Sequence, residues 1–193
     1  MAPTSPATEP LITATQIAAR VDELASEINQ EYEGVDELVL IGVLKGSFIF
    51  LADLARRITV PHRIEFIAVS SYGATERTDH PGDVRLIMDI RHPVNGAHVL
   101  LVEDIVDTGY TIAYLQRLIS ARGPASLRTC ALVRKLERAE IEAPVDYLGF
   151  DIPDVWVVGY GLDWAERFRT LPDICVVDPN KSATESDDEV GIS

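Results

Sequence analysis

The chain has 193 residues, 47% of them hydrophobic, and a formal net charge of −14 at pH 7. A chain of this size is typical of one domain that buries roughly 70% of the surface its unfolded form exposes. Free-standing nucleic-acid-binding proteins present a basic face, so the charge argues against DNA or RNA as the main partner. Because no apolar run approaches the ~20 residues that span a bilayer and no secretory signal is apparent, we expect no membrane partner and a cytoplasmic localisation.

Both ends of the chain are expected to be disordered. Residues 1–10 are rich in Pro, Thr and Ala, while residues 181–193 combine several acidic residues with few apolar ones. The two cysteines, Cys130 and Cys175, each lie inside an apolar run, as is typical of buried thiols in a reducing compartment. We therefore place a single domain at residues 11–180, between a disordered leader and an acidic disordered tail.

The first predicted elements are a helix, a strand and a second helix. Thr13 and Gln16 have the spacing of a capping box at the start of the first helix. Its apolar face consists of Ile17, Val21, Leu24 and Ile28. Residues 38–44 form a short apolar strand, and a second helix follows at about residues 48–58.

Strands and helices continue to alternate along the rest of the chain. Strands at residues 64–70 and 84–88 flank a polar segment, residues 73–83, whose Pro and Gly indicate a long loop. The next strand starts at residue 99 and is followed by a helical pattern at residues 112–119. Further short strands are predicted at residues 127–133, 147–150, 155–158 and 174–177. This alternation predicts an α/β fold with a mostly parallel sheet, whose ligands bind beyond the carboxyl ends of the strands.

The most informative segment is residues 99–111, V-L-L-V-E-D-I-V-D-T-G-Y-T. Its apolar start has the length and branching of a strand buried on both faces. The polar, glycine-containing loop then leads into a helix, which places several backbone N–H groups and the positive helix end around one point, as in a phosphate site. Glu103 and Asp104 would repel a phosphate unless they face another part of the ligand, such as ring hydroxyls. The segment therefore indicates a site for a ribose phosphate.

This segment closely resembles the phosphoribosyl-pyrophosphate motif of type I phosphoribosyltransferases. Three further segments are similar to the 6-oxopurine branch of that family, the hypoxanthine-guanine phosphoribosyltransferases. They are I-G-V-L-K-G-S at residues 41–47, S-S-Y-G at residues 70–73, and L-G-F-D-I-P-D-V-W-V-V-G-Y-G-L-D-W-A-E-R-F-R at residues 148–169. The resemblance covers about residues 13–177 in order. It implies the type I phosphoribosyltransferase fold, a central, mostly parallel sheet flanked by helices, with a small hood region and a flexible lid loop at about residues 71–83.

The resemblance implies an enzyme of purine salvage. Members of this branch transfer the 5-phosphoribosyl group from phosphoribosyl pyrophosphate to N9 of hypoxanthine or guanine, which gives IMP or GMP and pyrophosphate, with Mg²⁺ as cofactor. They form homodimers or homotetramers. Because the transition state has oxocarbenium character at the ribose C1, the site must hold an anionic donor, neutralise the departing pyrophosphate and remove a proton from the base.

The resemblance assigns the ribose and its phosphate to the central segment. The matching positions are Glu103, Asp104, Asp107, Thr108, Gly109, Tyr110 and Thr111. Asp107 resembles the family's general base, which takes the proton from purine N7 or stabilises it there. Taken without the family, residues 107–111 fit an ordinary strand-to-helix turn with a capping side chain equally well.

The leaving group, the metal and the lid are assigned in the same way. The pyrophosphate contacts match Lys45, Gly46 and Arg169. The family carries a cis peptide bond before this lysine, which the sequence cannot show. Asp163 is expected to bind Mg²⁺ directly, and Glu103 and Asp104 directly or through water. Ser71 and Tyr72 begin the lid loop, which closes over the reacting centre in the family.

Purine recognition is expected at Lys135, Trp156 and Val157. Lys135 matches the lysine that contacts the purine O6, which favours 6-oxopurines over adenine. The neighbouring Arg134 leaves an ambiguity in register, and the spacing to residues 149–150 favours Lys135. Trp156 would stack on the purine and Val157 would offer its backbone N–H and C=O, although without the family pattern core packing is the simpler explanation for Trp156.

Two other functions stay open at this point. A relative that prefers xanthine would differ only subtly in its base pocket. A regulator that binds nucleotide and controls RNA or DNA would usually add a basic surface or a DNA-binding module, and the sequence indicates neither. The motifs G-x-G-x-x-G and G-x-x-x-x-G-K-[ST] do not occur, which argues against dinucleotide binding and P-loop hydrolysis, and the four histidines lack the spacing of metal ligands.

Overall fold

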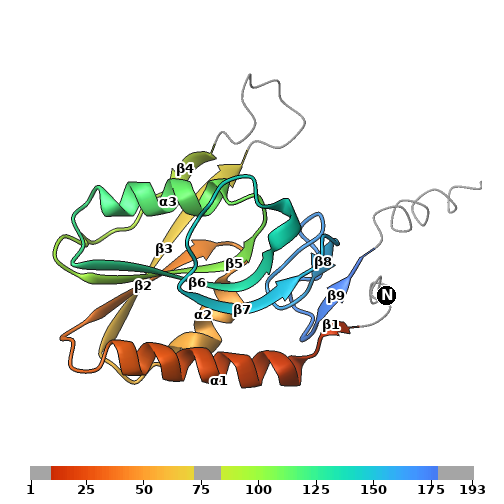
Figure 1. Cartoon of the computed structure of the whole chain (residues 1–193), viewed down its shortest axis with the longest axis horizontal. Coiled ribbons are helices and arrows are strands. Elements are labelled where there is room, and N and C mark those ends of the chain that lie inside the picture. Colours follow the sequence, from red (N-terminus) through yellow and green to blue (C-terminus); the bar gives the residue numbers. More distant parts are fainter. Residues whose placement is uncertain (1–9, 72–83, 178–193) are drawn as a thin grey trace, which may run out of the picture.

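A six-stranded sheet organises the structure, a computed structural model that describes residues 10–71 and 84–177 (Figure 1). The strand order is β4-β3-β2-β5-β6-β7. The strands are β2 (Leu38–Leu44), β3 (His62–Ser71), β4 (Val84–Met88), β5 (His98–Val106), β6 (Ser126–Lys135) and β7 (Tyr147–Ile152). β4 pairs antiparallel with β3, while the other neighbours pair in parallel. The predicted α/β fold with a mostly parallel sheet is therefore confirmed.

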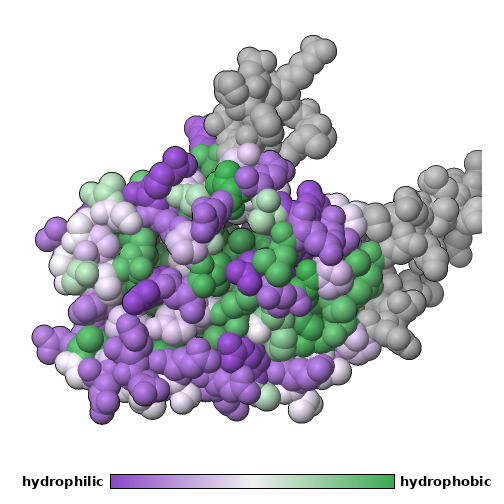
Figure 2. All heavy atoms as spheres, viewed as in Figure 1, coloured by the Kyte–Doolittle hydropathy of each residue, from purple (hydrophilic) through white to green (hydrophobic). Residues whose placement is uncertain are grey.

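Helices cover both faces of this sheet. α1 (Ala14–Glu31) and α2 (Phe48–Ala55) lie on one face, and α3 (Tyr110–Ser120) lies on the other (Figure 1). The predicted capping box begins α1, because Thr13 Oγ1 accepts a hydrogen bond from the Gln16 amide and the Gln16 side chain accepts one from the Thr13 amide. The predicted apolar face of α1 is buried, and its outward face is mainly hydrophilic (Figure 2). α2 is shorter than predicted.

The sheet has an apolar core on each side. In β2, Leu38 and Leu40 pack on the side of α1 and α2, whereas Val39 and Ile41 pack on the side of α3, and all four are fully buried. Burial on both faces explains why β2 is an unbroken apolar run and not an alternating one. Because close-packed cores hold the sheet from both sides, the loops at the carboxyl ends of its strands start from a rigid frame.

A second, three-stranded sheet forms a small hood, as the resemblance implies. β1 (Pro10–Ile12), β9 (Ile174–Val176) and β8 (Val157–Val158) pair antiparallel in the order β1-β9-β8 (Figure 1). The sequence does not predict β1, because its first residue falls in the expected leader and a three-residue strand shows no periodicity. The hood's own core consists of Val158, Cys175 and Val177, packed against Trp164, Phe168 and Leu171.

Parts of three predicted segments lie outside the described residues. They are the leader up to residue 9, the lid loop after Ser71 (with Tyr72) and the tail at residues 181–193. Ser71 itself is the last residue of β3. None of the described helices is both long enough and apolar enough to cross a membrane.

A buried carboxylate ties β3 to the segment that follows β4. Glu65 is only 6% exposed and accepts hydrogen bonds from the Arg91 amide and His92 Nδ1, and Arg63 lies beside it. Burial opposes ionisation of Glu65, but these hydrogen bonds and the Arg63 charge outweigh it, and its pKa is lowered. The carboxylate therefore stabilises the fold above its ordinary pKa, and this contribution is lost as the pH falls through the lowered pKa.

Replacing Glu65 with glutamine is therefore expected to lower the free energy of unfolding by about 1–2 kcal/mol at about pH 7. The difference from the unaltered protein should shrink as the pH falls through the lowered pKa of Glu65, below which both the folded and the unfolded state bind the proton. Urea denaturation over a series of decreasing pH values measures it. Glu37→Gln is the matched control, because Glu37 pairs with the same Arg63 from an exposed position. An equal loss in both variants would contradict the role of burial.

Candidate active site at the carboxyl ends of the strands

The predicted site residues meet at one edge of the large sheet. Lys45 follows β2, residues 107–111 follow β5, and Lys135 ends β6, so all three lie at carboxyl ends of parallel strands. A pocket of about 200 Å³ opens at this edge. Predicted residues from three parts of the chain line it: Lys45 and Gly46, Glu103 and Asp104, and Asp163 and Arg169.

The loop after β5 is shaped as an anion cradle. Gly109 is the N-cap of α3 and has a φ of 91°, a left-handed conformation that glycine adopts without strain. The loop is fixed from outside, since the Thr108 carbonyl accepts hydrogen bonds from the amides of Glu140 and Ile141. Thr111 lines the pocket at the first turn of the helix. Free N–H groups and the positive end of the α3 dipole are therefore available to a phosphate.

The acidic pair lies within β5, which continues to Val106 and does not end before the pair; Glu103 is buried and Asp104 is half-buried. Glu103 is 5% exposed, and its Oε2 has no hydrogen-bond partner among the described residues. Burial, together with the nearby Asp104, raises the pKa of Glu103 well above its ordinary value, and burial also raises that of Asp104. Two unneutralised carboxyl groups beside an anion cradle need ligand hydroxyls or a cation.

The loop after β2 packs tightly against this pair. The peptide bond between Leu44 and Lys45 is cis, as the resemblance implies. A Cβ placed on Gly46 would lie only 1.6 Å from Asp104 Oδ2, so no other residue fits there without displacing the carboxylate. The backbone of this loop is therefore pressed against the pocket, where its polar groups can reach a bound anion.

The segment of residues 161–173, which leads to β9 and is called the hood loop here, closes the other side of the pocket. Arg169 Nη2 lies 2.8 Å from Asp163 Oδ1, and Arg169 Nη1 donates a 2.8 Å hydrogen bond to the Gly161 carbonyl. Glu166, which the sequence analysis missed, pairs with Lys45 at 2.8 Å and with Arg169 at 3.4 Å. The Glu166 carboxylate thus forms ion pairs with both of the cationic side chains, Lys45 and Arg169, that the resemblance assigns to pyrophosphate. Glu166 has a φ of 63°, a left-handed backbone conformation that directs its side chain towards Lys45. No spacing of residues in the sequence predicts this conformation.

Lys135 and Trp156 lie together, as expected for a base pocket. Lys135 is 4% exposed, and its Nζ lies 5.6 Å from the Trp156 ring centroid. Trp156 leaves 53% of its surface exposed and contacts Trp164 edge to face, so it is not a core residue. Arg134 instead pairs with Asp151 at 2.8 Å. The contact with Trp156 is therefore made by Lys135, the residue that the spacing favours.

Two charged residues beside this pocket, Arg138 and Asp154, were not predicted from the sequence. Arg138 Nε lies 3.1 Å from Asp107 Oδ1, without the alignment of a hydrogen bond. Asp154 Oδ1 lies 3.4 Å from Lys135 Nζ and 3.7 Å from Arg138 Nη1. The two acids and two bases form a connected charge network around the loop that carries Asp107. Arg138 lies in a short 3-10 turn, Leu136–Arg138, that the strand and helix patterns do not reveal.

The site offers carboxylates to a cation but no complete ligand set. Across residues 10–71 and 84–177, no group of three or more His, Cys, Asp or Glu side chains is placed to hold a metal ion. Mg²⁺ keeps several waters and takes few protein ligands, with phosphate oxygens completing its shell. A divalent cation here would therefore depend on a bound ligand as well as on the carboxylates.

Fold and site together define an α/β protein that binds a phosphorylated sugar. The parallel strands end in a phosphate cradle, an acidic pair with a buried glutamate lies beside it, and an arginine, a lysine and an exposed indole surround the same edge. Residues 11–164 match the profile of the phosphoribosyl transferase domain. The chain belongs to this family, and its fold is the type I phosphoribosyltransferase fold.

Individual relatives are similar over most of their length. A hypoxanthine-guanine phosphoribosyltransferase of Dictyostelium discoideum is 47% identical over 167 residues, which is 85% of this chain and 92% of the relative. A hypoxanthine phosphoribosyltransferase of Haemophilus influenzae is 47% identical, over 83% of this chain and 90% of the relative. The solved structure of the Trypanosoma cruzi hypoxanthine phosphoribosyltransferase with its product IMP has a TM-score of 0.83 and 45% identity, covering 92% of this chain and 97% of that one.

Proposed function

We propose that the protein transfers the 5-phosphoribosyl group from phosphoribosyl pyrophosphate to N9 of hypoxanthine or guanine, which gives IMP or GMP and pyrophosphate. The relatives carry the names of enzymes with this activity. The observation that carries the proposal is the buried Lys135 beside the exposed face of Trp156, at the same sheet edge as the phosphate cradle. This pairing suits a flat base that bears an oxo group.

The donor is held by groups from both sides of the pocket. The backbone of residues 107–111 and the α3 dipole bind the 5′-phosphate, while Glu103 and Asp104 receive the ribose hydroxyls. Lys45, Gly46 and Arg169 bind the pyrophosphate, once Glu166 gives up its two ion pairs. The planar guanidinium of Arg169 can donate two hydrogen bonds to the phosphate oxygens as charge develops on them.

The transfer then breaks the bond between the ribose C1 and the pyrophosphate oxygen. The electron pair of that bond leaves with pyrophosphate, and the lone pair of purine N9 forms the new bond to C1. The proton that the purine must lose passes from N7 to the Asp107 carboxylate. Arg138, 3.1 Å from Asp107, holds this carboxylate beside the pocket. Ser71 and Tyr72, at the start of the lid loop, would exclude water during this step.

The base is selected by a buried cation. Lys135 donates to the purine O6, whereas the amino group of adenine would present a donor to it. Trp156 stacks on the ring, and the backbone of Val157 in β8 meets the base edge.

Mg²⁺ is the cation we propose for this site. The residues fit it, because the buried Glu103 Oε2 finds no hydrogen-bond partner within residues 10–71 and 84–177 and a hard cation prefers carboxylate oxygen. Asp163 would bind it directly, and Glu103 and Asp104 would bind it directly or through water. When bound, it would neutralise part of the charge on the departing pyrophosphate.

The activity is tested by mixing the protein with phosphoribosyl pyrophosphate, Mg²⁺ and one base at a time. We expect pyrophosphate release and nucleotide formation with hypoxanthine and with guanine, and none with adenine. Turnover with xanthine alone would favour the xanthine-preferring alternative. Absence of pyrophosphate release with every base, together with tight RNA binding, would instead support the alternative function, a regulatory protein that binds nucleotide and controls RNA or DNA.

We also propose that the protein is at least a homodimer, formed through an apolar patch on α2, β3 and β4. This patch consists of Phe48, Ile64, Phe66 and Met88, each of which exposes between 39% and 44% of its surface. It borders an open groove of about 510 Å³ beside α2. A contiguous apolar surface of this kind is typical of a subunit interface.

Replacing Ile64 in this patch with glutamate is expected to shift the protein towards monomers, because a charge would be buried at the interface without a partner. Sedimentation velocity measures the change in mass. Leu136→Glu is the matched control, since Leu136 is an exposed apolar residue on another element. A monomeric unaltered protein at micromolar concentration would refute the proposed dimer.

A further inference from the structure

A single tyrosine connects the hood loop to helix α2. Tyr160 follows β8 and precedes the loop that carries Asp163 and Arg169. It is 8% exposed and has a φ of 48°, a left-handed conformation that is unfavourable for a tyrosine. Its hydroxyl donates a 2.7 Å hydrogen bond to Asp53 Oδ2, and its amide donates a 2.8 Å hydrogen bond to the Leu171 carbonyl. These hydrogen bonds therefore hold Tyr160 in a backbone conformation that is otherwise unfavourable for tyrosine.

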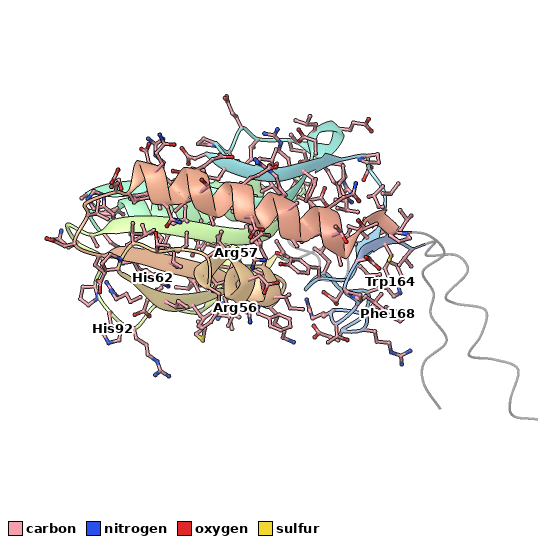
Figure 3. All side chains as sticks on the ribbon, turned by 90° about the horizontal axis from the view of Figure 1, so that it is seen from below. Arg56, Arg57, His62, His92, Trp164 and Phe168 are labelled. Atoms are coloured by element: carbon pink, nitrogen blue, oxygen red, sulfur yellow. The ribbon has the colours of Figure 1, made fainter. Side chains whose placement is uncertain are left out.

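The acceptor of this hydrogen bond is itself fixed to the frame. Asp53 lies in α2, where its carboxylate pairs with Arg56 and its carbonyl accepts a 3.0 Å hydrogen bond from Arg57. Arg57 also pairs with Asp22 of α1. Figure 3, seen from the face covered by α1 and α2, shows Arg56 and Arg57 at the end of α2 and Trp164 and Phe168 in the hood. Tyr160 thus joins the hood loop to both helices of this face.

The next residue makes a second contact with the pyrophosphate side. A Cβ on Gly161 would lie 1.9 Å from the Gly46 carbonyl oxygen, so the two backbones touch. The Gly161 amide donates to the Arg169 carbonyl, and Arg169 Nη1 donates back to the Gly161 carbonyl. The loop that presents Arg169 is therefore positioned at two adjacent points, one on α2 and one on the loop that follows β2.

We infer that Tyr160 is a positioning residue for the pyrophosphate half of the site, acting through its hydrogen bond to Asp53 on the loop that presents Asp163 and Arg169. This inference rests on the proposed function. The purine half is held mainly by other contacts, because Lys135 ends β6, Asp107 follows β5, and Val157 is fixed in β8 by its pairing with Val176 of β9. Loss of the Tyr160 hydroxyl should therefore affect capture of the donor and leave capture of the base nearly unchanged.

The test is the variant Tyr160→Phe, compared with Tyr147→Phe. Tyr147 is also 8% exposed, and within the described part of the chain its hydroxyl donates no hydrogen bond. We expect Tyr160→Phe to raise the KM for phosphoribosyl pyrophosphate about tenfold, the effect of losing a hydrogen bond to a charged acceptor. The KM for hypoxanthine should stay within about twofold. Tyr147→Phe should change neither KM.

Two companion variants test the partner. Asp53→Ala should reproduce the donor defect, and adding Tyr160→Phe to it should cause no further rise, because the two residues act as one unit. Asp53→Asn keeps an acceptor oxygen and should restore most of the donor affinity. Thermal unfolding of each variant checks that the fold is intact.

The outcomes separate this inference from the proposed function. If the unaltered protein releases no pyrophosphate with hypoxanthine or guanine, the proposed function fails. If it is active but Tyr160→Phe matches Tyr147→Phe in donor KM, or raises both KM values equally, the positioning role of Tyr160 is wrong.

Discussion

Replacing Asp107 with asparagine is expected to lower kcat about 10²- to 10³-fold, the usual contribution of a positioned general base. Asparagine has the same shape and keeps an oxygen facing Arg138, so the phosphate cradle and its anchoring to residues 140–141 should remain. The KM values for donor and base should therefore change by only a few-fold. Steady-state rates of IMP formation measure the effect.

Asp151→Asn is the matched control, because Asp151 is a carboxylate of the neighbouring β7 that pairs with Arg134 outside the pocket. Its kcat should equal that of the unaltered protein. A kcat for Asp107→Asn within about threefold of the unaltered protein would show that the proton leaves the purine by another route.

The second large effect is expected at Lys135. Glutamine is shorter and neutral, so Lys135→Gln should lose the charged donor to the purine O6 without placing a new charge in the pocket. We expect kcat/KM for hypoxanthine and guanine to fall about 10²-fold, since a site built to hydrogen-bond a substrate group depends strongly on that bond. The KM for phosphoribosyl pyrophosphate should stay nearly constant.

Arg134→Gln is the control for Lys135, because Arg134 is the adjacent cation and forms its ion pair with Asp151. It should retain the activity on both bases. If Arg134→Gln loses activity on 6-oxopurines and Lys135→Gln keeps it, the assignment of the purine contact must move by one residue.

Elements with strong local signals could be predicted well. β2 and β4 have the predicted bounds, and the capping box and the buried face of α1 follow from side-chain spacing. These features depend on neighbours in sequence, so a single chain carries enough information. The pocket at the carboxyl edge could also be predicted, because parallel strands place successive loops on one edge.

Features set by tertiary contacts could not be predicted in this way. Glu166 reaches Lys45 across more than a hundred positions in the chain, through a left-handed backbone that no motif encodes. Arg138 lies in the turn after β6 and Asp154 follows β7, and they meet Asp107 and Lys135 only in the folded chain. β1 exists only as a partner of β9. Each of these features depends on a contact between residues far apart in sequence, and the spacing of neighbouring residues carries no information about such contacts.

Under the proposed function, the carboxylate of Glu166 takes the place of the diphosphate on Lys45 and Arg169 in the resting pocket. Both side chains of its pair with Lys45 are about two-thirds solvent-accessible, at 66% and 65%, so water screens the attraction between them. Exchange of this carboxylate for an incoming anion should therefore be inexpensive. Glu166 contacts both Lys45 and Arg169, so simple anions such as sulfate should compete with it for these two side chains in the absence of the donor.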